Sequence, residues 1–171
     1  MHSRLGASYG YLQKVVVVVV IQLVAYFVNG QLFLIFSVFS RVLSIEPDNL
    51  EATRLKILHS LCRDGDLNAV VRSLENFMTL CKKHEPHNAK YFVENARMFS
   101  QLASYDERLL NQTMKFARFA TELEVDNAEH VADVGRILLL MGKDKDAYQE
   151  FRAATNMDNT SMSALYGDSR K

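Results

Sequence analysis

Two cysteines and two histidines, at Cys62, Cys81, His84 and His87, are the residues whose types could hold a metal ion. Thiolate and imidazole groups of this kind bind zinc in tetrahedral sites. The predicted helices keep them apart, because Cys62 falls at the turn end of a helical hairpin and Cys81 about fourteen residues along the return helix, roughly 20 Å away at about 1.5 Å per residue. The same separation argues against a Cys62–Cys81 disulfide. We therefore expect no metal site here.

Other catalytic patterns are missing from the sequence. It contains no phosphate-binding glycine loop, nucleophile elbow or HExxH motif. The acidic pairs Asp64 with Asp66 and Asp144 with Asp146 flank predicted turns, where carboxylates commonly cap helices. Lysine plus arginine and aspartate plus glutamate each number 20, so the chain has no net charge and no basic stripe for nucleic acid. The sequence therefore predicts a protein that is not an enzyme and does not bind nucleic acid.

Residues 128–154 indicate the elements that position the rest of the chain. Apolar and small residues recur there at the places of a helical hairpin, and those places are Val131, Val134, Gly135, Leu138, Ala147, Phe151 and Ala154. This spacing is typical of a tetratricopeptide (TPR) repeat. Gly135 lacks a side chain where two helices must approach closely, and Gly142 is expected to end the first helix in a left-handed conformation. We expect Ala147 and Ala154 to be small where the second helix crosses its neighbours.

The preceding residues predict further helical hairpins. The helices are expected at residues 50–62, 67–83, 89–103 and 106–123, with Asn88 as a cap and the phenylalanines at 77, 92, 99, 116 and 151 in the core. The hairpin at 89–123 is longer than the usual TPR of about 34 residues and lacks the turn glycine. Another helix, at 162–166, has no partner before the chain ends. The sequence thus predicts an all-α fold, a TPR-type α-solenoid of stacked antiparallel helical hairpins in residues 39–171, with the last repeat incomplete.

A polar leader, residues 1–14, precedes an uncharged apolar segment at residues 15–38. One interpretation is a buried or degenerate helical hairpin, with helices at 15–29 and 31–44. A second is a transmembrane helix, because a run longer than about 18 apolar residues is sufficient to span a bilayer. A third is an artefact of the gene model, because six consecutive valines suit no packing pattern well. The sequence leaves the three open.

Several short segments, taken together, resemble a known family. They are residues 44–52, 61–66, 85–89 and 157–165, within a likeness that runs from Phe39 to the C-terminus and has no single diagnostic motif. They resemble an internal part of the tetratricopeptide repeat protein 21 family, the large TPR subunit of intraflagellar transport complex A. Members of that family are much longer, so the chain resembles a fragment of one. Residues 15–38 do not obviously match.

The resemblance implies a non-catalytic scaffold without a cofactor. Its partners would be the other protein subunits of complex A and ciliary cargo proteins. It would act in retrograde transport along ciliary microtubules and in the entry of cargo into cilia. The implied location is the cilium and the cytoplasm, in association with the cytoskeleton.

Protein–protein interaction by a helical solenoid is the favoured function. In such a stack the first helix of each hairpin lines a concave groove that holds a peptide or a neighbouring subunit. The register places five residues toward that groove: Glu51, Arg54, Glu129, Ala132 and Arg136. The alternative for these residues is that they are ordinary solvated helix positions. The alternative function is a membrane-anchored adaptor, located at a membrane through residues 15–39, whose repeats form a cytosolic docking module.

Overall fold

The computed structural model describes residues 32–63, 66–158 and 160, and the described residues contain seven α-helices and no strand. They belong to two compact units, one within residues 1–63 and one within residues 64–171. The predicted leader at 1–14, the predicted helix at 15–29 and the predicted helix at 162–166 lie outside the described residues. No helix among the described residues has the length and apolar character needed to cross a bilayer.

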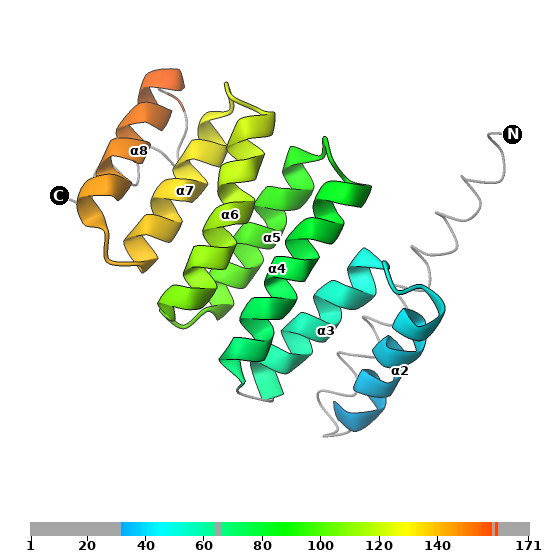
Figure 1. The fold of residues 1–171 in the computed structure, drawn as a ribbon. Helices are drawn as coiled ribbons and strands as arrows, with labels where there is room; N and C mark the ends of the chain where they lie inside the picture. The colour runs from blue at the N-terminus through cyan, green and yellow to red at the C-terminus, as the bar shows by residue number, and fades with distance from the viewer. Residues whose placement is uncertain (1–31, 64–65, 159, 161–171) are drawn as a thin grey trace, which may run out of the picture. The chain divides into compact units, whose positions relative to one another are not determined.

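The first unit contains α2 (Leu32–Ile45) and α3 (Leu50–Arg63), which pack against each other (Figure 1). Both agree with the predicted helices at 31–44 and 50–62. Between them, Pro47 has no N–H to continue a helix, and the Asn49 side chain accepts a hydrogen bond from the Ala52 N–H at 2.9 Å. The end of one helix and the start of the next are therefore set by neighbouring residues.

The second unit contains five helices, which are α4 (Leu67–His84), α5 (Ala89–Leu102), α6 (Glu107–Leu123), α7 (Ala128–Leu140) and α8 (Asp144–Met157). Helices α5 and α6 form one hairpin and α7 and α8 the next (Figure 1). The two first helices, α5 and α7, pack on each other, and the second helix α6 packs on α4. The prediction of an all-α stack of antiparallel hairpins is confirmed.

A turn with glutamate at one position and asparagine three residues later recurs along the chain; we call it the Glu–Asn turn. It occurs at 46–49, 85–88 and 124–127, so the spacing from 46 to 85 and from 85 to 124 is 39 residues. In each copy the asparagine amide donates to the glutamate carboxylate, at 3.0, 3.0 and 2.8 Å. Its carbonyl oxygen accepts from an N–H in the first turn of the next helix, at 2.9, 3.0 and 3.1 Å. The hairpin at 89–123 is therefore regular in a 39-residue frame, close to the period of about 40 residues in armadillo-type repeats.

The core of the second unit is aromatic. The five phenylalanines predicted for it are buried, and Phe77 lies 5.8 Å from Phe116 and 6.2 Å from Phe99 between ring centroids. The small residues behave as expected, because Ala147 and Ala154 are fully buried and Gly142 has a φ of +70°. A Cβ on Gly135 would lie 2.9 Å from two ring carbons of Phe151. Leu102, at the end of α5, lies outside this core and is 41% exposed.

Candidate protein-binding face on helices α5 and α7

Charged side chains line one face of α5 and the neighbouring face of α7. We call these residues the α5–α7 face, and they are Lys90, Glu94 and Arg97 on α5 and Glu129, Asp133 and Arg136 on α7. They recur three or four residues apart on each helix, so each set projects from one side. Because α5 and α7 pack directly on each other, the two sets meet across the helix contact.

Asp133 is the centre of this face. Its side chain is only 2% exposed, and its carboxylate accepts hydrogen bonds from two arginines. Arg97 donates from Nε to both oxygens at 2.9 Å and from Nη2 at 2.7 Å. Arg136 donates from Nε at 3.1 Å and also from Nη2. A buried carboxylate is tolerated only when it is paired in this way.

The two guanidinium groups remain partly accessible to solvent. The side chain of Arg97 is 45% exposed and that of Arg136 is 41% exposed. The hydrogen bond with Asp133 raises the pKa of Arg97 above its usual value; partial burial opposes this, and the charges of Asp133, Glu129 and Glu94 add to it. Arg97 therefore stays charged while it is held in one orientation.

The arrangement follows the 39-residue frame. Arg97 and Arg136 occupy the same position in successive repeats, from 97 to 136, and Glu94 and Asp133 do so from 94 to 133. The arginine of one repeat thus binds the acid of the next. Helix geometry also brings each arginine beside the acid three residues before it. The first helices of this unit are therefore joined by a ladder of alternating charge.

The structure separates the sequence-predicted binding residues into three groups. Arg136 and Glu129 belong to the α5–α7 face, and both are partly exposed. Ala132 is fully buried, so its side chain offers no surface to a partner. Glu51 and Arg54 pair with each other on α3 of the first unit, with side chains 30% and 25% exposed. Of the five predicted residues, Glu129 and Arg136 therefore lie on the α5–α7 face.

Sequence reasoning missed Arg97 and Asp133. Both lie on first helices, but the TPR pattern was aligned at about 34 residues, a frame in which 97 and 136 are not equivalent. The signal that would have found them is the repeated Glu-x-x-Asn at 46, 85 and 124. This 39-residue period brings the two arginines into register.

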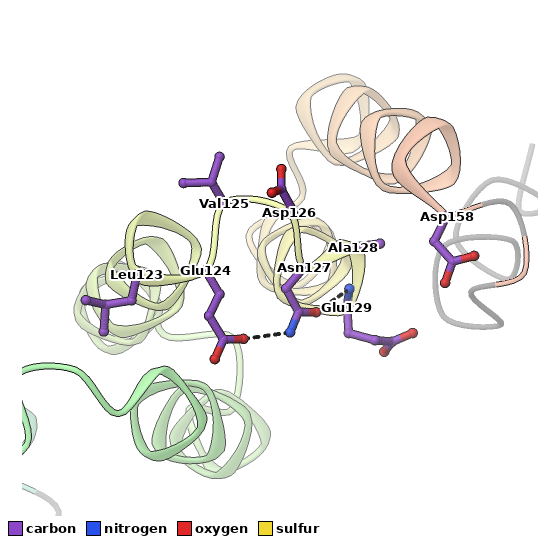
Figure 2. A pocket seen from close by; sticks show the side chains of 8 residues that line it. All are labelled: Leu123, Glu124, Val125, Asp126, Asn127, Ala128, Glu129 and Asp158. Atoms are coloured by element: carbon purple, nitrogen blue, oxygen red, sulfur yellow. Dashed lines mark hydrogen bonds between the residues drawn. The ribbon is translucent and has the colours of Figure 1, made fainter.

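An open groove of about 670 Å³ lies at the turn between α6 and α7. Its lining residues are Leu123, Glu124, Val125, Asp126, Asn127, Ala128, Glu129 and Asp158 (Figure 2). The Glu–Asn turn at 124–127 lines it, and there Asn127 donates to the Glu124 carboxylate and accepts from the backbone N–H of Glu129. Glu129 is shared between this groove and the α5–α7 face, so carboxylates border the face on the groove side.

The described residues include no group of three histidine, cysteine or acidic side chains arranged to hold a metal ion. Cys81 is buried, and the side chain of Cys62 lies outside the described residues. The α5–α7 face offers charged groups and hydrogen-bond donors at its surface.

Comparisons with known proteins agree with this repeat architecture. A family model described as the tetratricopeptide repeat protein 21 second ARM domain matches residues 72–168. Tetratricopeptide repeat protein 21B is 31% identical to this chain in Mus musculus and 30% identical in Homo sapiens, over 127 residues in each case. Tetratricopeptide repeat protein 21A of Homo sapiens is 22% identical over 136 residues. Each match covers 74% of this chain and 10% of the relative, so the chain corresponds to a small part of those proteins.

Proposed function

Because the chain belongs to the tetratricopeptide repeat protein 21 family, we propose that it is part of a non-catalytic helical-repeat scaffold that binds other proteins through its first helices. Stacked hairpins suit this role, since they create extended binding surfaces. The fold supports binding in general, and the identity of the partners rests on the family.

The finer proposal is a role in intraflagellar transport complex A. The partners are then the other protein subunits of that complex and ciliary cargo proteins. The location is the cilium and the cytoplasm, in association with the cytoskeleton. The support is the family match together with the sequence segments that resemble the family. The proposal concerns the long protein, to a small part of which this chain corresponds.

One observation carries the binding role: two half-exposed arginines are held by a single buried carboxylate on the α5–α7 face. Holding a long side chain in place before binding removes part of the entropy that association would otherwise cost. Arginine is also enriched among the residues that contribute most to protein interfaces. The face is thus prepared to receive acidic or hydrogen-bond-accepting groups of a partner.

The proposed contact residues are Glu51, Arg54, Glu129 and Arg136, to which the structure adds Arg97. Ala132 contributes to packing between the helices instead. Glu51 and Arg54 already form an ion pair with each other. A partner would therefore bind them either by breaking this pair or by adding a charged group to it.

Charge reversal tests the proposal. Arg54→Glu and Arg136→Glu, alone and together, should reduce capture of purified complex A subunits by the immobilised chain about tenfold or more, because each change removes donors and adds repulsion. Helicity, followed by circular dichroism, should be retained. Arg152→Glu, at an exposed position of α8, is the matched control and should leave capture unchanged. Equal capture by Arg136→Glu and Arg152→Glu would remove Arg136 from the binding face.

A further inference from the structure

The turn between α5 and α6 holds two consecutive residues in the left-handed region of backbone conformation. Ser104 has a φ of +47° and Tyr105 a φ of +64°. Residues with a Cβ rarely adopt this conformation, and a bulky aromatic residue does so least readily. The corresponding turn of the next hairpin uses a glycine, Gly142, at +70°. The chain therefore keeps strained residues where glycine would relieve the strain.

Packing and hydrogen bonds hold both ends of this turn in place. Ala103 is buried and closes α5. Asp106 caps α6 by accepting from the N–H groups of Arg108 and Leu109, at 3.0 and 3.2 Å. It also pairs with the Arg108 guanidinium at 2.9 Å, and this hydrogen bond is the main reason that the pKa of Asp106 is lowered. The two residues between these anchors must reverse the chain.

The strained turn displays apolar surface. Tyr105 is 77% exposed and Leu102, three residues earlier, is 41% exposed. Within the described residues, no hydrogen bond or ring contact holds the Tyr105 phenol. Glu107, exposed at the start of α6, likewise forms no ion pair within the described part of the chain. An exposed aromatic ring and an exposed carboxylate thus lie two residues apart at this turn.

We propose that this turn is a docking knob, in which Tyr105 enters an apolar pocket with a basic rim on a protein partner. Tyrosine suits such a pocket because its ring buries a large area at low entropic cost and its hydroxyl finds a partner at the pocket floor. Leu102 extends the apolar contact, and the free Glu107 carboxylate selects the basic rim. The left-handed backbone of Ser104 and Tyr105 places this ring on the exposed turn. This inference rests on the proposed function and assigns one of its contacts.

Three variants of the full chain distinguish the effect of the exposed Tyr105 ring from the effect of backbone strain. The readout is the capture of purified complex A subunits. Tyr105→Asn removes the ring but keeps a residue that tolerates the left-handed region, so capture should fall about tenfold or more while the melting temperature does not decrease. Ser104→Gly relieves strain beside the ring, so capture should be kept and the melting temperature should rise by about 2 to 4 °C. Ile45→Asn, at an exposed apolar residue of α2, is the control and should retain capture.

The outcomes distinguish the two levels of the proposal. If the unaltered chain captures the subunits and Tyr105→Asn captures them equally, the docking knob is excluded and the proposed function stands. If the unaltered chain captures none, the proposed function fails and the knob fails with it. A photo-crosslinking amino acid placed at position 105 should form an adduct with one complex A subunit, and the same probe at position 45 should form none. Equal labelling from both positions would contradict the proposal.

Discussion

At the scale of single residues, the buried carboxylate of the described chain, Asp133, lies where two arginines pair with it. Asp133 is almost fully buried, and its pairing with Arg97 and Arg136 offsets the loss of hydration. Because both guanidinium groups keep contact with water, they would remain solvated if the carboxylate were lost. The stability that this cluster contributes is therefore smaller than that of a fully buried ion triad.

Asp133→Asn tests this contribution. The amide keeps the shape of the carboxylate but removes its charge and places a donor against arginine donors, so the free energy of unfolding should fall by about 1 to 3 kcal/mol. Urea denaturation followed by circular dichroism measures the change. Asp126→Asn, at an exposed turn residue, is the control and should change stability by less than about 0.5 kcal/mol. Equal effects of the two substitutions would show that Asp133 is not the centre of the cluster.

Single residues also show what sequence patterns could and could not predict. The left-handed conformation of Gly142 could be predicted, because a glycine that directly follows a helix commonly ends it in that conformation, as it does here. The Arg97–Asp133 pair could not, because it joins residues 36 positions apart and depends on how α5 lies against α7. Ala132 shows the same limit. The helical register predicts on which side of the helix it lies, but it does not predict that a neighbouring element buries that position.

At the scale of elements, the close approach of α7 and α8 depends on one missing side chain. A Cβ at Gly135 would lie within 2.9 Å of the Phe151 ring, and that ring is itself fully buried. Interiors packed at this density accept an added methyl group only when a neighbour moves. The TPR pattern predicted this pair of positions because the constraint is local to one hairpin.

A double-mutant cycle on this contact gives a second stability prediction. Gly135→Val should lower the free energy of unfolding by about 2 kcal/mol or more through overcrowding against Phe151. In a chain that already carries Phe151→Leu, the same substitution should cost about 1 kcal/mol less, because the smaller side chain leaves room. Thermal and urea unfolding measure all four chains.

Gly142→Ala supplies the matched control for that cycle. No atom lies within 4 Å of a Cβ built at Gly142, so the cost comes only from its left-handed backbone, at about 1 kcal/mol. This cost should be the same with and without Phe151→Leu. If Gly135→Val were also additive with Phe151→Leu, the proposed contact between α7 and α8 would be refuted.

The positions of α3 to α6 were predictable to within one residue, because each of these helices follows a capping side chain. Asp66, Asn88, Asp106 and Asn127 each accept hydrogen bonds from the first turn of the helix that follows. The repeat period was harder to obtain. The hairpin of α7 and α8 follows the TPR pattern best, yet the 39-residue spacing of the Glu–Asn turns describes the two repeats before it.

At the scale of the whole molecule, the five predicted core phenylalanines all lie within the second unit. All five predicted core phenylalanines, from Phe77 to Phe151, are on α4 to α8. The family match at residues 72–168 falls within the same unit. We therefore expect residues 66–171 to fold without the residues before them, as one cooperative unit.

The last prediction concerns residues 15–38, whose uncharged sequence is compatible with a membrane anchor or with a buried hairpin. The full chain and residues 66–171 should be expressed in parallel, and circular dichroism should first show a single cooperative transition for the shorter chain. Membranes are then extracted with alkaline carbonate, which releases peripheral proteins and retains spanning ones. If the apolar segment packs as a repeat, both chains should appear in the soluble fraction. Retention of the full chain alone would overturn the buried-hairpin interpretation and favour the membrane-anchored adaptor, since the two chains share every helix of the second unit.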